Sequence, residues 1–133
     1  METSHRIILL AHGSSDRRWC ETFEALAAPT VEAIPGSVVA YMELSDPSME
    51  KIVADAVAEG CKTFTVLPLF LAAGRHLRKD VPAMIADMEA EHGIRIQLEA
   101  PVGENAQLGL AIRTVVEQTL ARTGVPTTAT GSA

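Results

Sequence analysis

Short apolar runs alternate along the chain with longer stretches in which apolar residues recur at helical spacing. The runs are rich in β-branched residues and have the length of buried strands; they cover residues 6–11, 37–43, 63–71 and 94–100. A strand followed by a helix, repeated four times, predicts a parallel sheet with helices on both faces. The expected fold class is therefore α/β, a three-layer sandwich around a four-stranded parallel sheet.

Each helical stretch carries one apolar stripe. The stripes consist of Trp19, Phe23, Leu26, Ala27, Val31 and Ile34, then Ile52, Val53, Ala56 and Val57, then Val81, Met84, Ile85 and Met88, and last Leu108, Ile112, Val115, Val116 and Leu120. Asp46 before Pro47 predicts the start of the second helix, because a capping residue often precedes a proline at the first helical position. Asp80 is expected to cap the third helix, which ends at Gly93.

Two segments depart from this regular pattern. Pro68 interrupts the third run, and proline donates no hydrogen bond to a strand ladder, so it marks either a bulge or the end of pairing. Residues 69–73 would then leave the sheet as a wall. The small, polar residues 123–133 carry no apolar stripe. We therefore expect one α/β domain over residues 1–122 and a disordered tail over residues 123–133.

Composition and charge limit the class of protein, its compartment and its partners. The 133 residues are 47% hydrophobic and 21% charged, as in an ordinary globular domain, and the formal net charge of −6 argues against a general nucleic-acid binder. Cys20 and Cys61 form no CxxC pair and no zinc spacing, which favours a reducing compartment. No apolar run reaches the roughly 18 residues of a membrane span, and the first residues lack a signal-peptide pattern. We expect a cytoplasmic protein without a nucleic-acid or membrane partner.

Three residues with metal-binding chemistry fall at the ends of three predicted strands. The first strand leads to His12, the second ends at Glu43, and the third runs on to His76. Ligands of open parallel sheets bind at the carboxyl ends of the strands, which meet at one edge. Two imidazoles and a carboxylate bind a divalent transition metal and leave coordination positions open. The set does not distinguish cobalt, iron, nickel and zinc.

A basic and an apolar surface are expected beside this edge. The apolar part is the sequence "PLFLAAG" at residues 68–74. Helix N-termini at the same edge add positive potential. A metal with a basic fringe and an apolar floor suits a flat macrocycle rich in carboxylates. The candidate substrate-binding residues are Ser14, Arg17, Arg75, Arg78 and Lys79.

Each of these residues also has an ordinary explanation. His12 can cap a turn, His76 can face solvent in a loop, and Glu43 can favour the N-terminus of the next helix. The basic residues can form a solvated fringe. The metal site is favoured because three separate coincidences would otherwise fall at three strand ends.

Three motifs resemble the short sirohydrochlorin chelatases of the CbiX/SirB type. They are "LLAHGSSDRRW", "YMELSDPS" and "VLPLFLAAGRHLRKDVP", and the likeness runs in the same order over residues 6 to 120. Members of that family insert cobalt or iron into sirohydrochlorin, on the routes to cobalamin and siroheme, and related archaeal members insert nickel. The sequence departs from the family at Ala11 and Arg75, where glycine is common.

The resemblance implies a lyase with a flavodoxin-like, chelatase-like half as its fold. It implies a homodimer that binds sirohydrochlorin or a related tetrapyrrole in a cleft. The divalent metal (Co²⁺, Fe²⁺ or Ni²⁺) is then a substrate, and no permanent cofactor is needed. The two active-site histidines of the family fall on His12 and His76, which would hold the metal and exchange protons, and its acidic metal-site residue falls on Glu43.

Three other functions remain open at this point. A metal or tetrapyrrole carrier would use the same residues without accelerating insertion. A histidine phosphatase also ends its first strand at His-Gly, but its histidine follows a phosphate-binding arginine, whereas this chain has Ala11 there. A phosphate-binding module using "HGSSD" would leave Glu43 and His76 without a role.

Overall fold

Four parallel strands form the centre of the molecule. The structure, a computed structural model, describes residues 5–72 and 74–125. The strands are β1 (His5–Ala11), β2 (Ser37–Tyr41), β3 (Thr63–Pro68) and β4 (Arg95–Leu98), in the order β2-β1-β3-β4. The predicted α/β class and the four-stranded parallel sheet are confirmed, although β2 and β3 end two and three residues earlier than expected.

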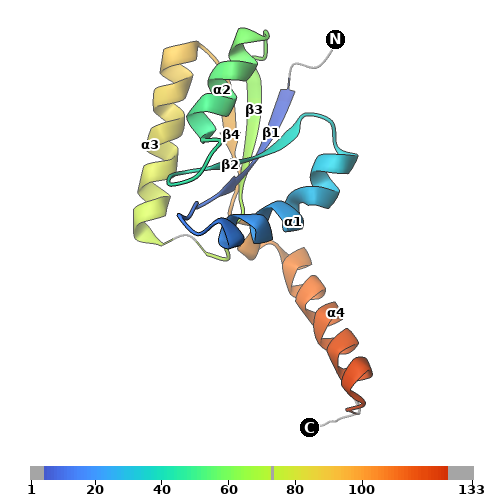
Figure 1. Cartoon of the computed structure of the whole chain (residues 1–133). Helices are drawn as coiled ribbons and strands as arrows, with labels where there is room; N and C mark the ends of the chain where they lie inside the picture. Colours follow the sequence, from blue (N-terminus) through green and yellow to red (C-terminus); the bar gives the residue numbers. More distant parts are fainter. Residues whose placement is uncertain (1–4, 73, 126–133) are drawn as a thin grey trace.

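Helices lie on both faces of this sheet, as Figure 1 shows. Three of them follow the strands: α1 (Arg17–Ala33) covers one face, and α2 (Met49–Ala58) and α3 (Arg75–His92) cover the other. After β4 come a 3₁₀ turn, η1 (Val102–Glu104), and the last helix, α4 (Ala106–Thr123). In Figure 1, α4 runs away from the sheet instead of covering it.

The main core lies between the sheet and the helices α2 and α3. It is mostly aliphatic, with Phe64 as its large aromatic member. A smaller cluster of Ala11, Cys20 and Tyr41 lies under α1. Side chains of a strand alternate between the two faces, so Ile8 and Leu10 belong to the main core whereas Ala11 lies on the α1 side. Burial of this apolar surface is the main force that holds the sheet and its helices together.

The register brings the predicted strand ends to one edge. Ala11 lies beside Tyr41 of β2, and Leu10 lies beside Pro68 of β3. Pairing of β3 ends at Pro68, which confirms the interpretation that this proline marks the end of pairing and not a bulge. The residues that follow the three strands are therefore neighbours, as the parallel arrangement requires.

The predicted start of α2 is wrong. The helix begins at Met49, and the hydroxyl of Ser48 accepts a hydrogen bond from the Lys51 backbone N–H at 3.1 Å. Pro47 is not the first helical residue because its carbonyl oxygen accepts a hydrogen bond from the Tyr41 backbone N–H at 2.9 Å. This bond holds Pro47 at the end of β2, so the helix begins after it.

The expected cap of α3 is also wrong. The helix begins at Arg75 with Gly74 at the capping position, so Asp80 and Pro82 lie inside it. Its end at Gly93, in the left-handed conformation, is as predicted. Most of the predicted tail, residues 126–133, lies outside the described residues, whereas Thr123 still belongs to α4.

No helix within residues 5–72 and 74–125 has both the length and the apolar character to cross a bilayer.

Candidate metal centre

The turn after β1 is pressed against the segment that follows β2. The Met42 backbone N–H donates to the Ala11 carbonyl at 3.0 Å, and the Glu43 N–H donates to the His12 carbonyl at 3.3 Å. Gly13 has a φ of +101°, and a Cβ there would lie 1.8 Å from the Glu43 carbonyl oxygen. Only glycine permits both this backbone conformation and this approach. The glycine after His12 is therefore what lets the two strand ends come together.

His12 lies half-buried at the end of β1. Its ring contacts Phe70 in an edge-to-face arrangement, with 6.2 Å between the ring centroids. Phe70 follows the end of β3 and is buried. His12 lines two different hollows of the surface.

The first hollow, called here the acidic cavity, brings His12 and Glu43 together. It has a volume of about 300 Å³, and both residues line it with Met42 from the segment after β2. Its other wall is α3, which contributes Leu77, Asp80, Ala83, Met84 and Asp87. Two of the three predicted metal ligands therefore share one cavity.

The backbone of His76 lies in the first turn of α3, one residue before Leu77 of the cavity wall. The side chain of His76 is outside the part of the structure that is described. Among the described side chains, no three His, Cys, Asp or Glu residues form a group able to hold a metal ion. The three-ligand site thus remains a prediction from the sequence.

Two carboxylates of the cavity were not assigned to it from the sequence. The sequence pattern predicts a helix cap at Asp80 and assigns no role to Asp87. Asp80, Met84 and Asp87 are spaced i, i+4 and i+7, so they lie on one side of α3. Once α3 is known to begin at Arg75, this spacing is the signal that identifies them.

The candidate basic residues differ in their surroundings. The Arg17 guanidinium donates to both carboxylate oxygens of Glu24, at 2.9 and 3.2 Å, and also pairs with Glu21. The hydrogen bond and charge of Glu24 raise the pKa of Arg17. Within the described residues, by contrast, the side chains of Arg75, Arg78 and Lys79 make no hydrogen bond or ion pair. These three are the cations of the set with the greater freedom to meet an anionic ligand.

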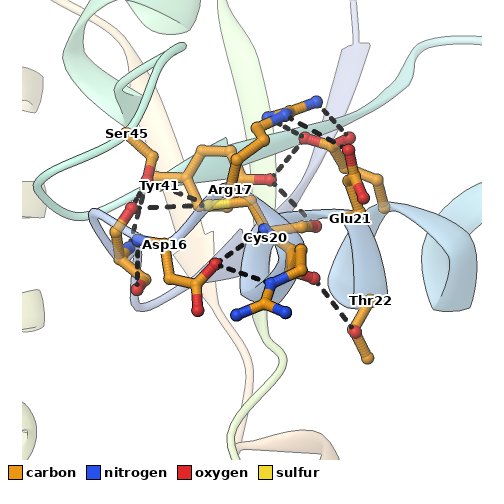
Figure 2. A network of polar contacts seen from close by, with 10 residues as sticks. Asp16, Arg17, Cys20, Glu21, Thr22, Tyr41 and Ser45 are labelled. Carbon is orange, nitrogen blue, oxygen red and sulfur yellow. Dashed lines mark hydrogen bonds and ion pairs between the residues drawn. The ribbon is translucent and has the colours of Figure 1, made fainter.

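A polar network joins the turn after β1 to α1 and to the segment after β2 (Figure 2). Ser14 belongs to this network through Ser45. The Ser45 hydroxyl donates to the Ser14 carbonyl at 2.7 Å and accepts from the Ser14 N–H at 3.0 Å. The Cys20 sulfur lies 3.1 Å from the same hydroxyl. Asp16 caps α1 through the Arg18 N–H at 3.0 Å. The network fixes the turn that carries His12.

Tyr41 connects this network to α1. Its hydroxyl donates to a carboxylate oxygen of Glu24 at 2.7 Å. Burial and the neighbouring Glu24 carboxylate raise the pKa of Tyr41 well above its ordinary value. The same hydrogen bond lowers the pKa of Glu24. Tyr41 therefore stays a donor, and Glu24 a charged acceptor, throughout the neutral pH range.

The second hollow beside His12 is apolar. This apolar groove has a volume of about 600 Å³ and lies on the α1 side of the sheet. Besides His12, its principal side chains are Trp19, Phe23, Leu26, Leu67 and Leu69. The sequence "PLFLAAG" was expected to supply an apolar wall, and Leu69, Phe70 and Leu71 do line this groove.

The fold and this arrangement of residues define a chelatase-like α/β domain. The model of the CbiX family matches residues 6–119. The chain therefore belongs to the CbiX family, which confirms the resemblance drawn from its motifs.

Individual relatives agree with this assignment. A crystal structure of a CbiX protein from Marinobacter aquaeolei VT8 is 62% identical, with a TM-score of 0.88, and the match covers 92% of this chain and 99% of that one. The sirohydrochlorin cobaltochelatase of Sulfurisphaera tokodaii is 24% identical over 86% of this chain and 92% of its own length. The chloroplastic sirohydrochlorin ferrochelatase of Arabidopsis thaliana is 35% identical over 73% of this chain and 44% of its own.

Proposed function

We propose that this chain is a sirohydrochlorin chelatase that inserts a divalent metal, cobalt or iron, into sirohydrochlorin for cobalamin or siroheme biosynthesis. Relatives that match most of the chain are named as chelatases of this substrate. The observation that carries the proposal is that His12 and Glu43 line one cavity at the carboxyl edge of the sheet, with α3 as its opposite wall. Nothing in the comparisons supports the carrier, the phosphatase or the phosphate-binding module.

In this proposal His12, His76 and Glu43 hold the incoming metal. Neutral imidazole and carboxylate suit first-row divalent metals, and three ligands leave positions for the macrocycle nitrogens. Insertion forms bonds from the metal to the ring nitrogens and releases two protons from pyrrole N–H groups. A neutral imidazole can accept such a proton. A histidine cannot bind the metal and accept a proton through the same nitrogen, so each ligating nitrogen can accept a pyrrole proton only after the metal has passed to the ring nitrogens.

The acidic cavity supports the same chemistry. Asp80 and Asp87 add negative charge to the wall that faces His12 and Glu43. Negative charge attracts a divalent cation and favours the imidazolium that forms when a proton is released. The metal is a substrate here, and we propose that no permanent cofactor takes part.

The macrocycle would be held by the basic start of α3. Cations at a helix N-terminus oppose the helix dipole, yet the first turn of α3 carries no acidic residue and begins with Arg75. Arg78 and Lys79 follow within about a turn. Binding of a substrate carboxylate would relieve this unfavourable arrangement. The guanidinium fork and the helix N-terminus would both stabilise the negative charge of the carboxylate. Ser14 and Arg17 remain proposed contacts, although both are already bonded within the protein.

The proposed partner and location have separate grounds. The homodimer that the family resemblance implies is kept as a proposal. A cytoplasmic location remains a prediction from the cysteine usage of the sequence.

The enzyme and carrier functions give different results in one assay. Sirohydrochlorin is mixed with Co²⁺, Fe²⁺ or Ni²⁺, and its absorbance is followed with and without protein. A chelatase raises the initial rate in proportion to its concentration and turns over many macrocycles per chain. A carrier forms at most one complex per site and leaves the rate at the spontaneous value, which would contradict the proposal.

A further inference from the structure

Among the described residues, no helix covers one half of the α1 side of the sheet. The helix α1 contacts β2, and α2 and α3 lie on the opposite face (Figure 1). The apolar groove occupies the half over β3, where Leu67 and Leu69 form its floor. Leu26 of α1, at its border, is 70% exposed. An apolar surface of this size at the centre of a sheet is unusual for a face that stays in water.

The helix α4 has the opposite property: it is amphipathic but contacts almost nothing. None of its residues is buried. Ile112 is 57% exposed and Val116 is 49% exposed. With Leu108, Val115 and Leu120 they form one stripe at helical spacing. Helices of proteins owe most of their stability to the packing of such a stripe, so α4 requires a surface to cover.

The junction between η1 and α4 fixes the direction in which α4 leaves. The Gly103 N–H donates to the Phe70 carbonyl at 3.0 Å, and a Cβ at Gly103 would lie 1.7 Å from the Leu71 carbonyl oxygen. The Asn105 side chain caps α4 through the Gln107 N–H at 2.8 Å. Leu108 still lines the groove, and from there the helix extends away from its own sheet. The chain thus holds α4 outside the groove that its stripe would fill.

We propose that two copies of this chain exchange α4, so that the helix of each copy lies in the apolar groove of the other. The 18 residues of α4 span about 27 Å, enough to cross the sheet of a partner. A two-fold axis makes both contacts identical and closes the assembly as a dimer. The occupant is a second copy because each chain carries both the groove and the helix that fits it.

The exchange also completes the proposed metal centre. His12 lines both the acidic cavity and the apolar groove. The α4 helix of the partner would therefore form a wall beside His12 and exclude water from that side of the imidazole. This consequence rests on the proposed function, whereas the exchange itself does not.

Sedimentation of paired variants tests the exchange. The wild-type protein is expected to be a dimer. The helix variant Ile112→Glu with Val116→Glu, and the groove variant Leu26→Glu, are each expected to be monomers. The matched control Thr114→Glu with Ala121→Glu places two carboxylates on the other side of α4 and should stay dimeric. Mixing the helix and groove variants should restore a heterodimer, because one intact helix then meets one intact groove.

Trp19, the only tryptophan of the chain, lines the groove and reports its occupancy. Its emission should shift to the red when the wild-type dimer is diluted into monomers, and should be red-shifted already in both monomeric variants. A monomeric wild-type protein would overturn the exchange, as would a dimeric Leu26→Glu variant or a mixture that stays monomeric. A wild-type protein that is monomeric and still inserts metal would overturn the exchange alone. A wild-type protein that is dimeric but inactive would overturn the proposed function alone.

Discussion

Replacing His12 by alanine should lower the rate of metal insertion into sirohydrochlorin by at least about 100-fold. In the proposed mechanism the imidazole either binds the metal or accepts a pyrrole proton, and alanine does neither. The ring is half-buried and contacts Phe70, so its loss should reduce the free energy of unfolding by only about 1 kcal/mol. The measurement is the initial rate of the absorbance change at saturating metal, together with thermal unfolding of the variant.

His5 offers a matched control on the same strand. It lies at the other end of β1, and its ring nitrogens are 2.8 and 2.9 Å from the hydroxyl oxygens of Thr63 and Thr65. His5→Ala should insert metal at the wild-type rate. A His12→Ala protein that is folded and as fast as His5→Ala would show that His12 has no part in the reaction.

Replacing Gly13 by alanine should unfold much of the population or lower the free energy of unfolding by at least about 3 kcal/mol. The new Cβ would lie 1.8 Å from the Glu43 carbonyl oxygen, and backbone rather than a flexible side chain must move to admit it. The backbone φ of +101° adds strain for any residue with a Cβ. Any variant that does fold should lose insertion activity, because the movement separates Glu43 from His12. Denaturant unfolding measures the first effect.

A substitution at Gly60 separates the effect of backbone strain from the effect of a steric clash. Its φ is +98°, but a Cβ there would meet nothing within 4 Å. Gly60→Ala should therefore cost only about 1 kcal/mol and leave the activity unchanged. Equal losses of stability in the two variants would mean that the contact between the two strand ends is unimportant.

The order of the elements could be predicted from the sequence because both signals involved are local. Apolar runs and helical stripes alternate, and parallel pairing follows from that alternation. The start of α2 could not be predicted, because the Pro47 carbonyl is bonded to Tyr41, a residue of another element. The start of α3 was missed since Gly74 supplies no capping side chain and the first turn is basic instead of acidic. The start of α2 is decided by a tertiary contact, and the start of α3 is decided by something other than helix stability.

The candidate site shows the same division. His12 and Glu43 line one cavity because strand ends in a parallel sheet meet at one edge, and that juxtaposition follows from the sequence pattern. Asp80 and Asp87 were missed, because their inclusion depends on where α3 begins. The alternation of strands and helices predicts helices on both faces of the sheet, whereas α4 runs away from it. An amphipathic pattern predicts that a helix covers an apolar surface, but it does not identify that surface. The junction at Gly103 directs α4 away from the sheet of its own chain.

The central claim is that His12, His76 and Glu43 bind one metal ion together, and cobalt X-ray absorption tests it most directly. Protein loaded with one Co²⁺ per chain should show two imidazole ligands in the wild type and one in either His12→Ala or His76→Ala. Glu43→Gln should keep both imidazoles and lose a carboxylate oxygen. An imidazole count that is the same in the wild type and in both histidine variants would contradict the claim.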